Sequence, residues 1–526
     1  MNKAIEIKQV GQLDIVSLSV PYTADPTRLF QALCSGKQNS LLLESADIDS
    51  KQDLKSMLLI DAALRIECNG NQVTFSALSD NGRHALTRIA AHAQGDVGIE
   101  QTDSQLLLTF TPANPDLDED SKLREASSFD ALRLVQHSFK STQQDADAEH
   151  DFSLFLAGLF AFDLVANFEP LGEAVASNQC PDYVFYLAET LMTIDHQQES
   201  CFVQGTVFDG TEQTKQQISY RLKKISELST KPAPLEETVK LAQCEPIASV
   251  SDEAFCQTVT DLKEFVVKGD VFQVVPSRRF TLPCPSPLAS YQKLKQNNPS
   301  PYMFYMNDEL FTLFGASPES ALKYDTRSNQ VEIYPIAGTR HRGKNADGSI
   351  NPDLDGRIEL ELRSDKKENA EHMMLVDLAR NDVARISAPG TRHIADLLKV
   401  DRYSHVMHLV SRVVGQLRPD LDALHAYQAC MNMGTLTGAP KIRAMQLIRD
   451  VEKQRRGSYG GAVGYLTGRG DLDSCIVIRS AYVENGVAQV QAGAGVVYDS
   501  DPQAEADETR GKAQAVISAI QAAHKE

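Results

Sequence analysis

The sequence contains no tryptophan, although its 526 residues include 20 phenylalanines and 15 tyrosines. Two interpretations are open: chance or packing, and an enzyme that must be translated when tryptophan is scarce. The composition is otherwise typical of a globular protein, with 42% hydrophobic and 23% charged residues.

Paired cysteines and excess positive charge are also missing. The nine cysteines are odd in number and show no Cys-x-x-Cys spacing, which favours reduced thiols over disulfides or zinc. The net charge of −19 argues against a nucleic-acid partner, because binding a phosphate backbone requires a basic face. Small anions held by a few local arginines and lysines remain compatible with this charge.

Neither a signal peptide nor a membrane span is expected. The first ten residues lack an apolar core. The most apolar run, Phe152 to Phe168, is interrupted by Asp163 and Asn167 and is typical of a buried strand or helix. We therefore expect a cytoplasmic protein.

The chain divides most clearly at residues 229–249, which are rich in proline, glutamate and small residues. Directly afterwards, Ser251 is placed to cap a helix that Gly269 ends. We therefore expect an N-terminal region over residues 1–230 and a C-terminal region over residues 250–526. The second region carries nearly all the motifs with chemical character.

Two predicted helices each carry a Glu-x-x-Glu pair, Glu368 with Glu371 and Glu505 with Glu508. Residues three apart are neighbours on a helix, so each pair repels. If both pairs face one core, each close contact costs on the order of 4 kcal/mol at an effective dielectric of 20. Magnesium reverses that sign and favours one or two carboxylates plus water and substrate oxygens. The alternative for each pair is ordinary surface charge.

Arg479 lies in the apolar run Cys475–Val483, which we interpret as a strand. A buried arginine must be paired, either with an internal acid or with a substrate carboxylate. The stretch QAGAGVV places Gly493 and Gly495 where backbone N–H groups could face an anion, although a bulge or close strand contact is the alternative.

Other candidate contacts each have an ordinary structural explanation. Thr435 precedes a helix and could cap it, and Lys512 could pair with Glu508 one turn earlier. His408 shares a strand face with valines and could be a satisfied core histidine. Three further candidates are Tyr459 in a glycine-rich bend and Gly338 and Thr339 at a strand end.

Together and in this order, the motifs resemble the chorismate-utilising enzyme family. The resembling segments of the C-terminal region are FQVVPSRR, GASPES, PIAGTR, KENAEHMMLVDLARND, RYSHVMHLVSRV, MNMGTLTGAPK, RRGSYGGAVGY, CIVIRS, QAGAGVV and DPQAEADET. The N-terminal region resembles one branch, the large subunits of anthranilate synthase, through LLLESADIDSKQDLKS and CPDYVFYLAETLMTIDH.

The resemblance implies an α/β fold in which two antiparallel sheets form a sandwich with helices outside and the active site between the sheets. It implies a lyase that converts chorismate and ammonia to anthranilate and pyruvate, the first step of tryptophan synthesis. It also implies Mg²⁺ as cofactor, feedback inhibition by tryptophan, and a heterotetramer of two large and two glutaminase small subunits. A monomer that uses free ammonia remains an alternative.

The resemblance also assigns roles to residues. Glu371 and Glu508 would ligate magnesium, with Glu368 and Glu505 around them. Glu319 would be the acid for the departing hydroxyl, and His408 would remove the ring proton. Contacts to chorismate would come from Gly338, Thr339 and Thr435 at the ring, from Lys512, and from Arg479, Tyr459, Gly493, Ala494 and Gly495 at the enolpyruvyl carboxylate.

Two positions distinguish branches of the family. Isochorismate and salicylate synthases resemble this chain but carry a water-activating lysine where it has Gln273. Aminodeoxychorismate synthases carry a nucleophilic lysine where it has Ala337. Ammonia is therefore the expected nucleophile, and aminodeoxychorismate synthase is the alternative enzyme. The alternative outside enzymes is a catalytically silent protein that senses tryptophan.

The segment LLLES by itself predicts a buried strand that ends in a turn. In the family it resembles the tryptophan site, where Glu44 would pair with the ligand's ammonium and Ser45 would hydrogen-bond it. The other expected contacts are Pro301, Tyr302 and Met303 against the indole, with Lys55, Val463 and Tyr465 as weaker candidates.

Overall fold

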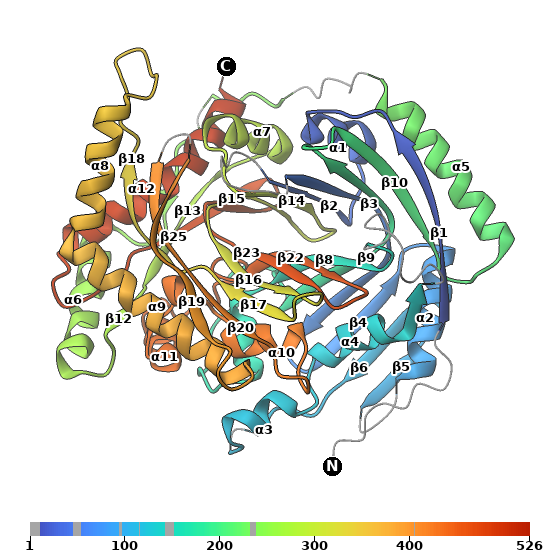
Figure 1. Cartoon of the computed structure of the whole chain (residues 1–526), viewed down its shortest axis with the longest axis horizontal. Helices are drawn as coiled ribbons and strands as arrows, with labels where there is room; N and C mark the ends of the chain where they lie inside the picture. The colour runs from blue at the N-terminus through green and yellow to red at the C-terminus, as the bar shows by residue number, and fades with distance from the viewer. Residues whose placement is uncertain are drawn as a thin grey trace.

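The computed structural model describes residues 11–45, 54–93, 97–114, 116–141, 152–231, 238–242, 244–403 and 406–525. Strands and helices of these segments form a layered α/β structure (Figure 1). Among the described residues, all strand pairings of the main sheet are antiparallel except that of β1 with β7.

The first layer is a run of neighbouring strands drawn from both halves of the sequence. In spatial order it contains β7 (Phe139–Ser141), β1 (Gly11–Val20), β10 (Ser200–Val207), β9 (Tyr183–Asp195), β3 (Lys55–Asn69), β2 (Ser40–Glu44), β14 (Tyr302–Asn307), β15 (Thr312–Ser317), β24 (Ser480–Glu484), β25 (Val487–Gly493), β13 (Ser277–Pro283) and β11 (Ile247–Ala248).

The second layer shares β3 and β9 with the first. It contains β5 (Gly98–Gln101), β6 (Gln105–Thr109), β4 (Gln72–Ala77), β3, β9, β8 (Phe155–Phe160), β22 (Ala462–Thr467), β23 (Leu472–Ile476), β16 (Ser320–Asp325), β17 (Gln330–Ile333) and β20 (Val406–Gln416), with β18 (Ile336–His341) and β19 (His393–Arg402) both beside β20.

The two layers are joined because β3 and β9 are long and irregular. The register of β3 against β9 shifts between Leu59 and Leu64. Before that shift β3 pairs with β2, and after it β3 pairs with β4. Such bulges bend a strand, so each strand serves one layer with each of its ends. The predicted sandwich is therefore one continuous hydrogen-bonded sheet system folded into two layers.

An apolar cluster fills the space between the layers. Leu59 and Phe304 come from the first layer, and Leu159 and Val463 come from the second. Alternate residues of each strand face this cluster, and the others face helices on the outside. The predicted class, with antiparallel sheets and helices outside, is confirmed.

In the part of the chain that the structure describes, helices cover the outer face of each layer. On the first they are α1 (Pro26–Cys34), α5 (Glu212–Ser229), α7 (Pro287–Asn297) and α12 (Pro502–His524). On the second they are α2 (Asp80–His92), α4 (Phe129–Ser138), α9 (Lys366–Ile386) and α10 (Ala423–Cys430). The remaining elements are α3 (Glu119–Arg124), α6 (Asp252–Lys268), α8 (Pro352–Ser364), α11 (Lys441–Glu452), the 3₁₀ turns η2 (Phe162–Asn167) and η3 (Gly434–Leu436), and the strand pair β12 (Gln273–Val274) and β21 (Gly438–Ala439).

Strands from the two predicted sequence regions are neighbours in both layers. In the first layer, β2 pairs with β14, and in the second, β8 pairs with β22. The division into residues 1–230 and 250–526 stays a prediction about the sequence, and both regions contribute to each layer.

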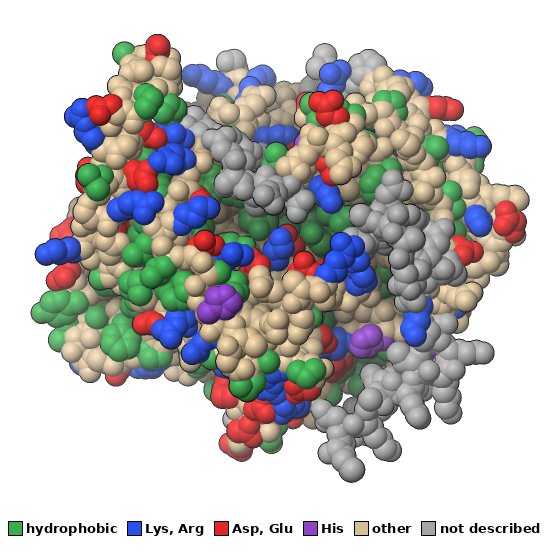
Figure 2. All heavy atoms as spheres, in the orientation of Figure 1, with side chains coloured by type: hydrophobic (Ala, Val, Ile, Leu, Met, Phe, Trp, Pro, Cys, Tyr) green, Lys and Arg blue, Asp and Glu red, His purple; other side chains and the backbone are tan. Residues whose placement is uncertain are grey.

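Two surface features bear on possible partners. On the face seen in Figure 2, Lys and Arg side chains are interspersed with Asp and Glu, so that face offers no broad basic surface. In the part of the chain that the structure describes, no helix combines the length and the apolar character that crossing a bilayer requires.

Candidate active site

Two adjacent crossings of the chain between the layers each carry a candidate residue. Glu319 lies between β15 of the first layer and β16 of the second. Arg479 lies between β23 of the second layer and β24 of the first. The two crossings are hydrogen-bonded, because the Ala316 amide donates to the Arg479 carbonyl at 3.1 Å and the Ile476 amide donates to the Glu319 carbonyl at 3.0 Å. Residues 160 positions apart therefore become neighbours.

Glu319 is buried, and its surroundings keep its carboxyl protonated at neutral pH. Burial raises the pKa of Glu319 to about 8. Four nearby groups act in the opposite sense: the Thr435 hydroxyl, which donates at 3.1 Å, the charges of Lys512 and Arg479, and a backbone hydrogen bond from Ile336. A carboxyl with such a pKa is suited to donate a proton.

Arg479 does not lie inside a strand, and that prediction was wrong. Its φ of 50° is left-handed, which breaks the apolar run into β23 and β24. A non-glycine residue in this region costs of order 1 kcal/mol or more and is characteristic of functional sites. Within the described residues, its guanidinium makes no hydrogen bond or ion pair; the charges of Glu508 and Glu319 act on it without direct contact. The charge is therefore available to a ligand carboxylate.

His408 lies on β20 with its ring beside β18. Its Nδ1 is 2.9 Å from the Thr339 hydroxyl on β18. Burial, followed by the charge of Arg479, lowers the pKa of His408 to about 4. The imidazole is therefore neutral at pH 7, which is the protonation state that a base requires.

Thr435 and Gly338 have different settings from those predicted. Thr435 lies in η3 rather than at a helix cap, and α11 begins after Pro440. Gly338 lies within β18 at a φ of 80°, not at its end, and a Cβ there would be 3.3 Å from Glu368 Oε2. Only glycine adopts this conformation without strain while leaving room for the glutamate.

The two Glu-x-x-Glu pairs lie on α9 and α12, as predicted, and the caps explain where these helices start. The Asp365 side chain accepts from the Lys367 and Glu368 amides, and the Asp501 side chain accepts from the Ala504 amide at 2.9 Å, with Pro502 next. In Figure 1 both helices lie on the same side of the molecule as α6 and α8.

The carboxylates of the two helices influence one another electrostatically. Burial raises the pKa of Glu371, and the charges of Glu368 on the same helix and Glu508 on the other raise it further. Burial also raises the pKa of Glu505. Lys512 Nζ is 2.5 Å from Glu508, so cations already offset part of this repulsion.

The donor set fits magnesium, although protein groups alone do not complete a site. Among the described residues, no three His, Cys, Asp or Glu side chains are already gathered as a metal cluster. Magnesium commonly takes only one or two carboxylates and fills its octahedron with water and substrate oxygens. Glu371 and Glu508 could supply two such ligands, and a dicarboxylate substrate could supply others.

The glycine-rich end of β25 adjoins a tyrosine and a lysine. A Cβ at Gly493 would be 3.1 Å from the Tyr459 hydroxyl, and one at Gly495 would be 3.1 Å from Gln273 Nε2. Lys512 Nζ donates to the Gly493 carbonyl at 3.1 Å. These contacts bring most of the predicted substrate-binding residues to one place.

Ala494 differs from the other members of that stretch. Its amide donates to the Pro276 carbonyl at 3.1 Å, so the strand contact is already made. The Ala494 amide is therefore not free to bind an anion, and an anion beside this stretch would have to be bound by other groups.

The predicted regulatory residues of the β2–β14 pair lie on its opposite faces, and two others lie on β22 of the second layer. Tyr302, Val463 and Tyr465 join the apolar cluster between the layers. Glu44 faces α1 and α7 instead, beside Met303 of β14. The division follows from the alternation of side chains along a strand.

Glu44 is buried and already has internal partners. It accepts hydrogen bonds from the Thr27 hydroxyl at 2.9 Å and the Tyr291 hydroxyl at 2.6 Å, and it pairs with Lys295. Sequence reasoning missed these three partners, because α1 and α7 carry no motif that signals them.

The other predicted regulatory residues lie near these strands. The Ser45 amide donates to the Lys55 carbonyl at 3.4 Å, which links the ends of β2 and β3. Pro301 is buried just before β14. Tyr465 stacks on Phe155 with ring centroids 5.2 Å apart.

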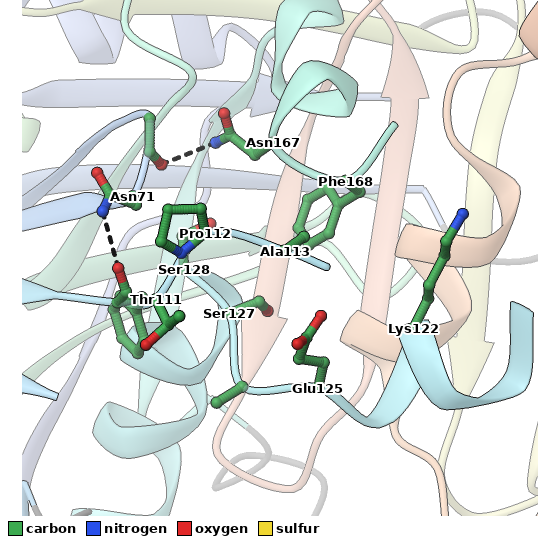
Figure 3. A pocket seen from close by; sticks show the side chains of 13 residues that line it. Asn71, Thr111, Pro112, Ala113, Lys122, Glu125, Ser127, Ser128, Asn167 and Phe168 are labelled. Carbon is green, nitrogen blue, oxygen red and sulfur yellow. Dashed lines mark hydrogen bonds between the residues drawn. The ribbon is translucent and has the colours of Figure 1, made fainter. Parts of the chain in front are cut away.

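A small cavity in the N-terminal region is separate from this site. Figure 3 shows it between the β3–β4 turn, the start of α4 and η2, with Asn71, Ser128 and Phe168 on its walls. Its volume of about 30 Å³ has room for a water molecule or two, and none of the predicted site residues lines it.

Comparisons with known proteins agree with the geometry. Residues 78–518 match the family described as chorismate binding enzyme. Anthranilate synthase component 1 from Vibrio parahaemolyticus is 71% identical, over 100% of this chain and 96% of that protein. The component 1 from Escherichia coli is 58% identical, over 98% of each chain.

A solved structure extends the agreement to the fold. Anthranilate synthase component I from Streptococcus pneumoniae superposes with a TM-score of 0.69 at 29% identity, covering 89% of this chain and 93% of that one. The family match, the curated relatives and the fold all lead to the same conclusion: the chain belongs to the chorismate binding enzyme family, in its anthranilate synthase component 1 group.

Proposed function

We propose that the chain binds chorismate with magnesium and uses ammonia to form anthranilate, pyruvate and water. The observation that carries this proposal is a complementary acid and base, both under the influence of the charge of Arg479. Glu319 is protonated and His408 is neutral at pH 7, and the unpaired guanidinium of Arg479 is near both. An acid, a base and an anion anchor are the groups that this lyase reaction needs.

The proposed reaction has two stages, and each uses one of these groups. Ammonia adds to the ring while Glu319 donates its proton to the departing hydroxyl, which leaves as water. His408 then accepts the ring proton as the enolpyruvyl C–O bond breaks, the ring becomes aromatic, and the departing enolate takes a proton at its methylene carbon to give pyruvate. The Thr435 hydroxyl and the Thr339 hydroxyl orient Glu319 and His408 respectively.

The two carboxylates of chorismate are assigned to two subsites. Glu371 and Glu508 would hold magnesium, with Glu368 and Glu505 around it, and the ion would neutralise the ring carboxylate when bound. Arg479 and Tyr459 would hold the enolpyruvyl carboxylate beside Gly493 and Gly495. Lys512, which contacts both Glu508 and Gly493, lies between the subsites.

The alternative of an aminodeoxychorismate synthase is less well supported. Ala337 on β18 offers no amine at the position of the nucleophilic lysine. Gln273 likewise offers no amine to activate water. Free ammonia is therefore the proposed nucleophile.

We assign the supply of ammonia to a separate glutaminase subunit. The name component 1, carried by the relatives, implies a second component. None of the nine cysteines has glycine two residues before it, as a nucleophile elbow would require. Seven of the nine are buried. We propose two large and two small subunits, in the cytoplasm.

Feedback inhibition by tryptophan belongs to the same proposal. Its ammonium would bind Glu44, and its indole would contact Met303, which lies on the same face of the β2–β14 pair, and Pro301 beside it. Ser45→Phe is expected to keep the activity and lose the inhibition, because the larger ring fills the space beside the turn. Inhibition retained in this variant would contradict the assignment.

The test of the function uses the purified chain with chorismate, magnesium and an ammonium salt. We expect anthranilate fluorescence to rise without a partner subunit and to fall when tryptophan is added. Another chorismate product, identified by chromatography, would keep the family and exclude the proposed reaction. The absence of any product would favour a silent sensor.

A further inference from the structure

Arg278 is a buried arginine that connects a strand to α12. It lies on β13 and is 2% exposed. Its guanidinium donates to α12 twice, from Nε to Thr509 Oγ1 at 2.9 Å and from Nη2 to the Ala506 carbonyl at 2.9 Å. Its Nη1 donates to Asp252 at 2.7 Å and to the Val250 carbonyl at 3.1 Å.

The two hydrogen bonds to α12 fall directly beside the candidate metal ligands. Ala506 follows Glu505, and Thr509 follows Glu508. The Thr509 hydroxyl donates in turn to the Ala506 carbonyl at 2.7 Å, so both contact points belong to one hydrogen-bonded unit. The guanidinium is planar and rigid, and it therefore restricts rotation of the helix about its own axis.

A small rotation of α12 would matter for a metal. Side chains reach about 6 Å from a helix axis, so a rotation of about 20° would displace a carboxylate by roughly 2 Å. Magnesium requires near-ideal octahedral geometry with oxygens at about 2.0–2.1 Å. A displacement of that size would remove Glu508 from the coordination sphere.

The same arginine fixes α12 relative to the other carboxylate subsite. Arg278 pairs with Ala492 of β25, and the preceding Ser277 pairs with Gly493. From the helix side, Lys512 donates to the Gly493 carbonyl. The strand pair and α12 are in direct contact. Arg278 therefore helps to set the distance between the two sites that would hold the carboxylates of chorismate.

We propose that Arg278 is a positioning residue that holds α12 in the orientation required for magnesium binding. This inference rests on the proposed function, in which Glu508 is a metal ligand. Arg278 itself contacts neither the substrate nor the ion. Its other contacts, with the rings of Phe255 and Phe280 at 5.0 and 5.3 Å, stabilise the core and would serve a purely structural role as well.

Magnesium affinity separates positioning from general stability. Magnesium is titrated by calorimetry into the chain saturated with chorismate, without ammonium or glutamine, so that no turnover occurs. Two variants are tested, Arg278→Met and Thr509→Val. The second removes one acceptor of the Arg278 guanidinium and keeps the shape of the side chain. Arg133→Met is the matched control, because Arg133 is also a buried arginine, paired with Asp422 away from the site.

We expect Arg278→Met to weaken magnesium binding by about 10- to 100-fold, the usual effect of losing a group that orients a ligand. Thr509→Val should weaken it less, in the same direction, and Arg133→Met should lower the melting temperature with magnesium affinity unchanged. If Arg278→Met does not fold, Thr509→Val alone decides. Wild-type affinity in folded Arg278 and Thr509 variants would overturn the inference. Absence of magnesium binding in the wild-type chain would overturn the metal assignment itself.

Discussion

The protonation state of Glu319 predicts the alkaline limit of the activity. With a pKa raised to about 8 by burial, about nine in ten molecules carry the proton at pH 7 and about one in ten at pH 9. If the protonated form is the acid, kcat/KM falls about tenfold over this interval, since kcat/KM reports the free enzyme. The assay is the rate of anthranilate formation at a fixed concentration of neutral ammonia, because the ammonium equilibrium would otherwise distort the profile.

Two variants test the assignment from different directions. Glu319→Gln removes the proton donor and is expected to lower kcat by about 10² to 10⁴, or about 3–5 kcal/mol of barrier, and to abolish the alkaline limb. Thr435→Val removes a hydrogen bond that stabilises the carboxylate, so the limb should move to higher pH.

The refuting results are equally specific. An alkaline limb that persists near pH 8 in Glu319→Gln would assign the titration to another group. A limb that moves to lower pH in Thr435→Val would mean that the hydroxyl does not act on the Glu319 carboxylate. The first result would remove Glu319 as the acid, the second would remove Thr435 as the group that acts on it, and both would leave the binding assignments in place.

Three further predictions follow from other groups. Glu371→Gln should abolish magnesium-dependent turnover while thermal unfolding stays close to wild type, and unchanged turnover would exclude this residue as a ligand. Lys295→Met removes the cation that competes with tryptophan for Glu44, so half-maximal inhibition should occur at a lower tryptophan concentration; an unchanged inhibition curve would show that the two cations do not share this carboxylate. Burial lowers the pKa of both His372 and His408 to about 4, so the unfolded chain binds more protons below pH 6.5 and stability falls as the pH falls, by about 2 kcal/mol per histidine at pH 5. Urea unfolding of the wild type and of His372→Asn at pH 7 and pH 5 checks this: the loss of stability should be about 2 kcal/mol smaller in the variant, whereas Glu319, whose raised pKa acts in the opposite sense, contributes equally to both chains.

Local features were predictable because they depend on residues close together in the chain. Ser251 caps α6 and Gly269 ends it in the left-handed conformation, as the sequence indicates. The starts of α9 and α12 follow from the same rules. The spacing of the Glu-x-x-Glu pairs on these helices was therefore predictable, and so was the repulsion that a cation would relieve.

Family resemblance supplied residue roles that local rules could not. Nothing in the neighbourhood of Glu319 or His408 in the sequence distinguishes an acid from a base. Their surroundings come from distant segments, since Thr435 contacts Glu319 and Thr339 contacts His408. The pKa shifts arise from burial, and burial is a property of the assembled fold.

Only the tertiary structure decided where the chain crosses between the layers. The apolar run around Arg479 was predicted as one strand, because composition does not show that its two halves pair with different neighbours. The 23 described strands of the main sheet join through β3 and β9, and these pairings connect residues up to hundreds of positions apart. Helix caps are fixed by contacts within one turn, whereas strand partners and buried charges are fixed by the packing of the whole chain. The sequence by itself therefore determined which helices carry the carboxylates, and the fold determined what those carboxylates, Glu319 and Arg479 face.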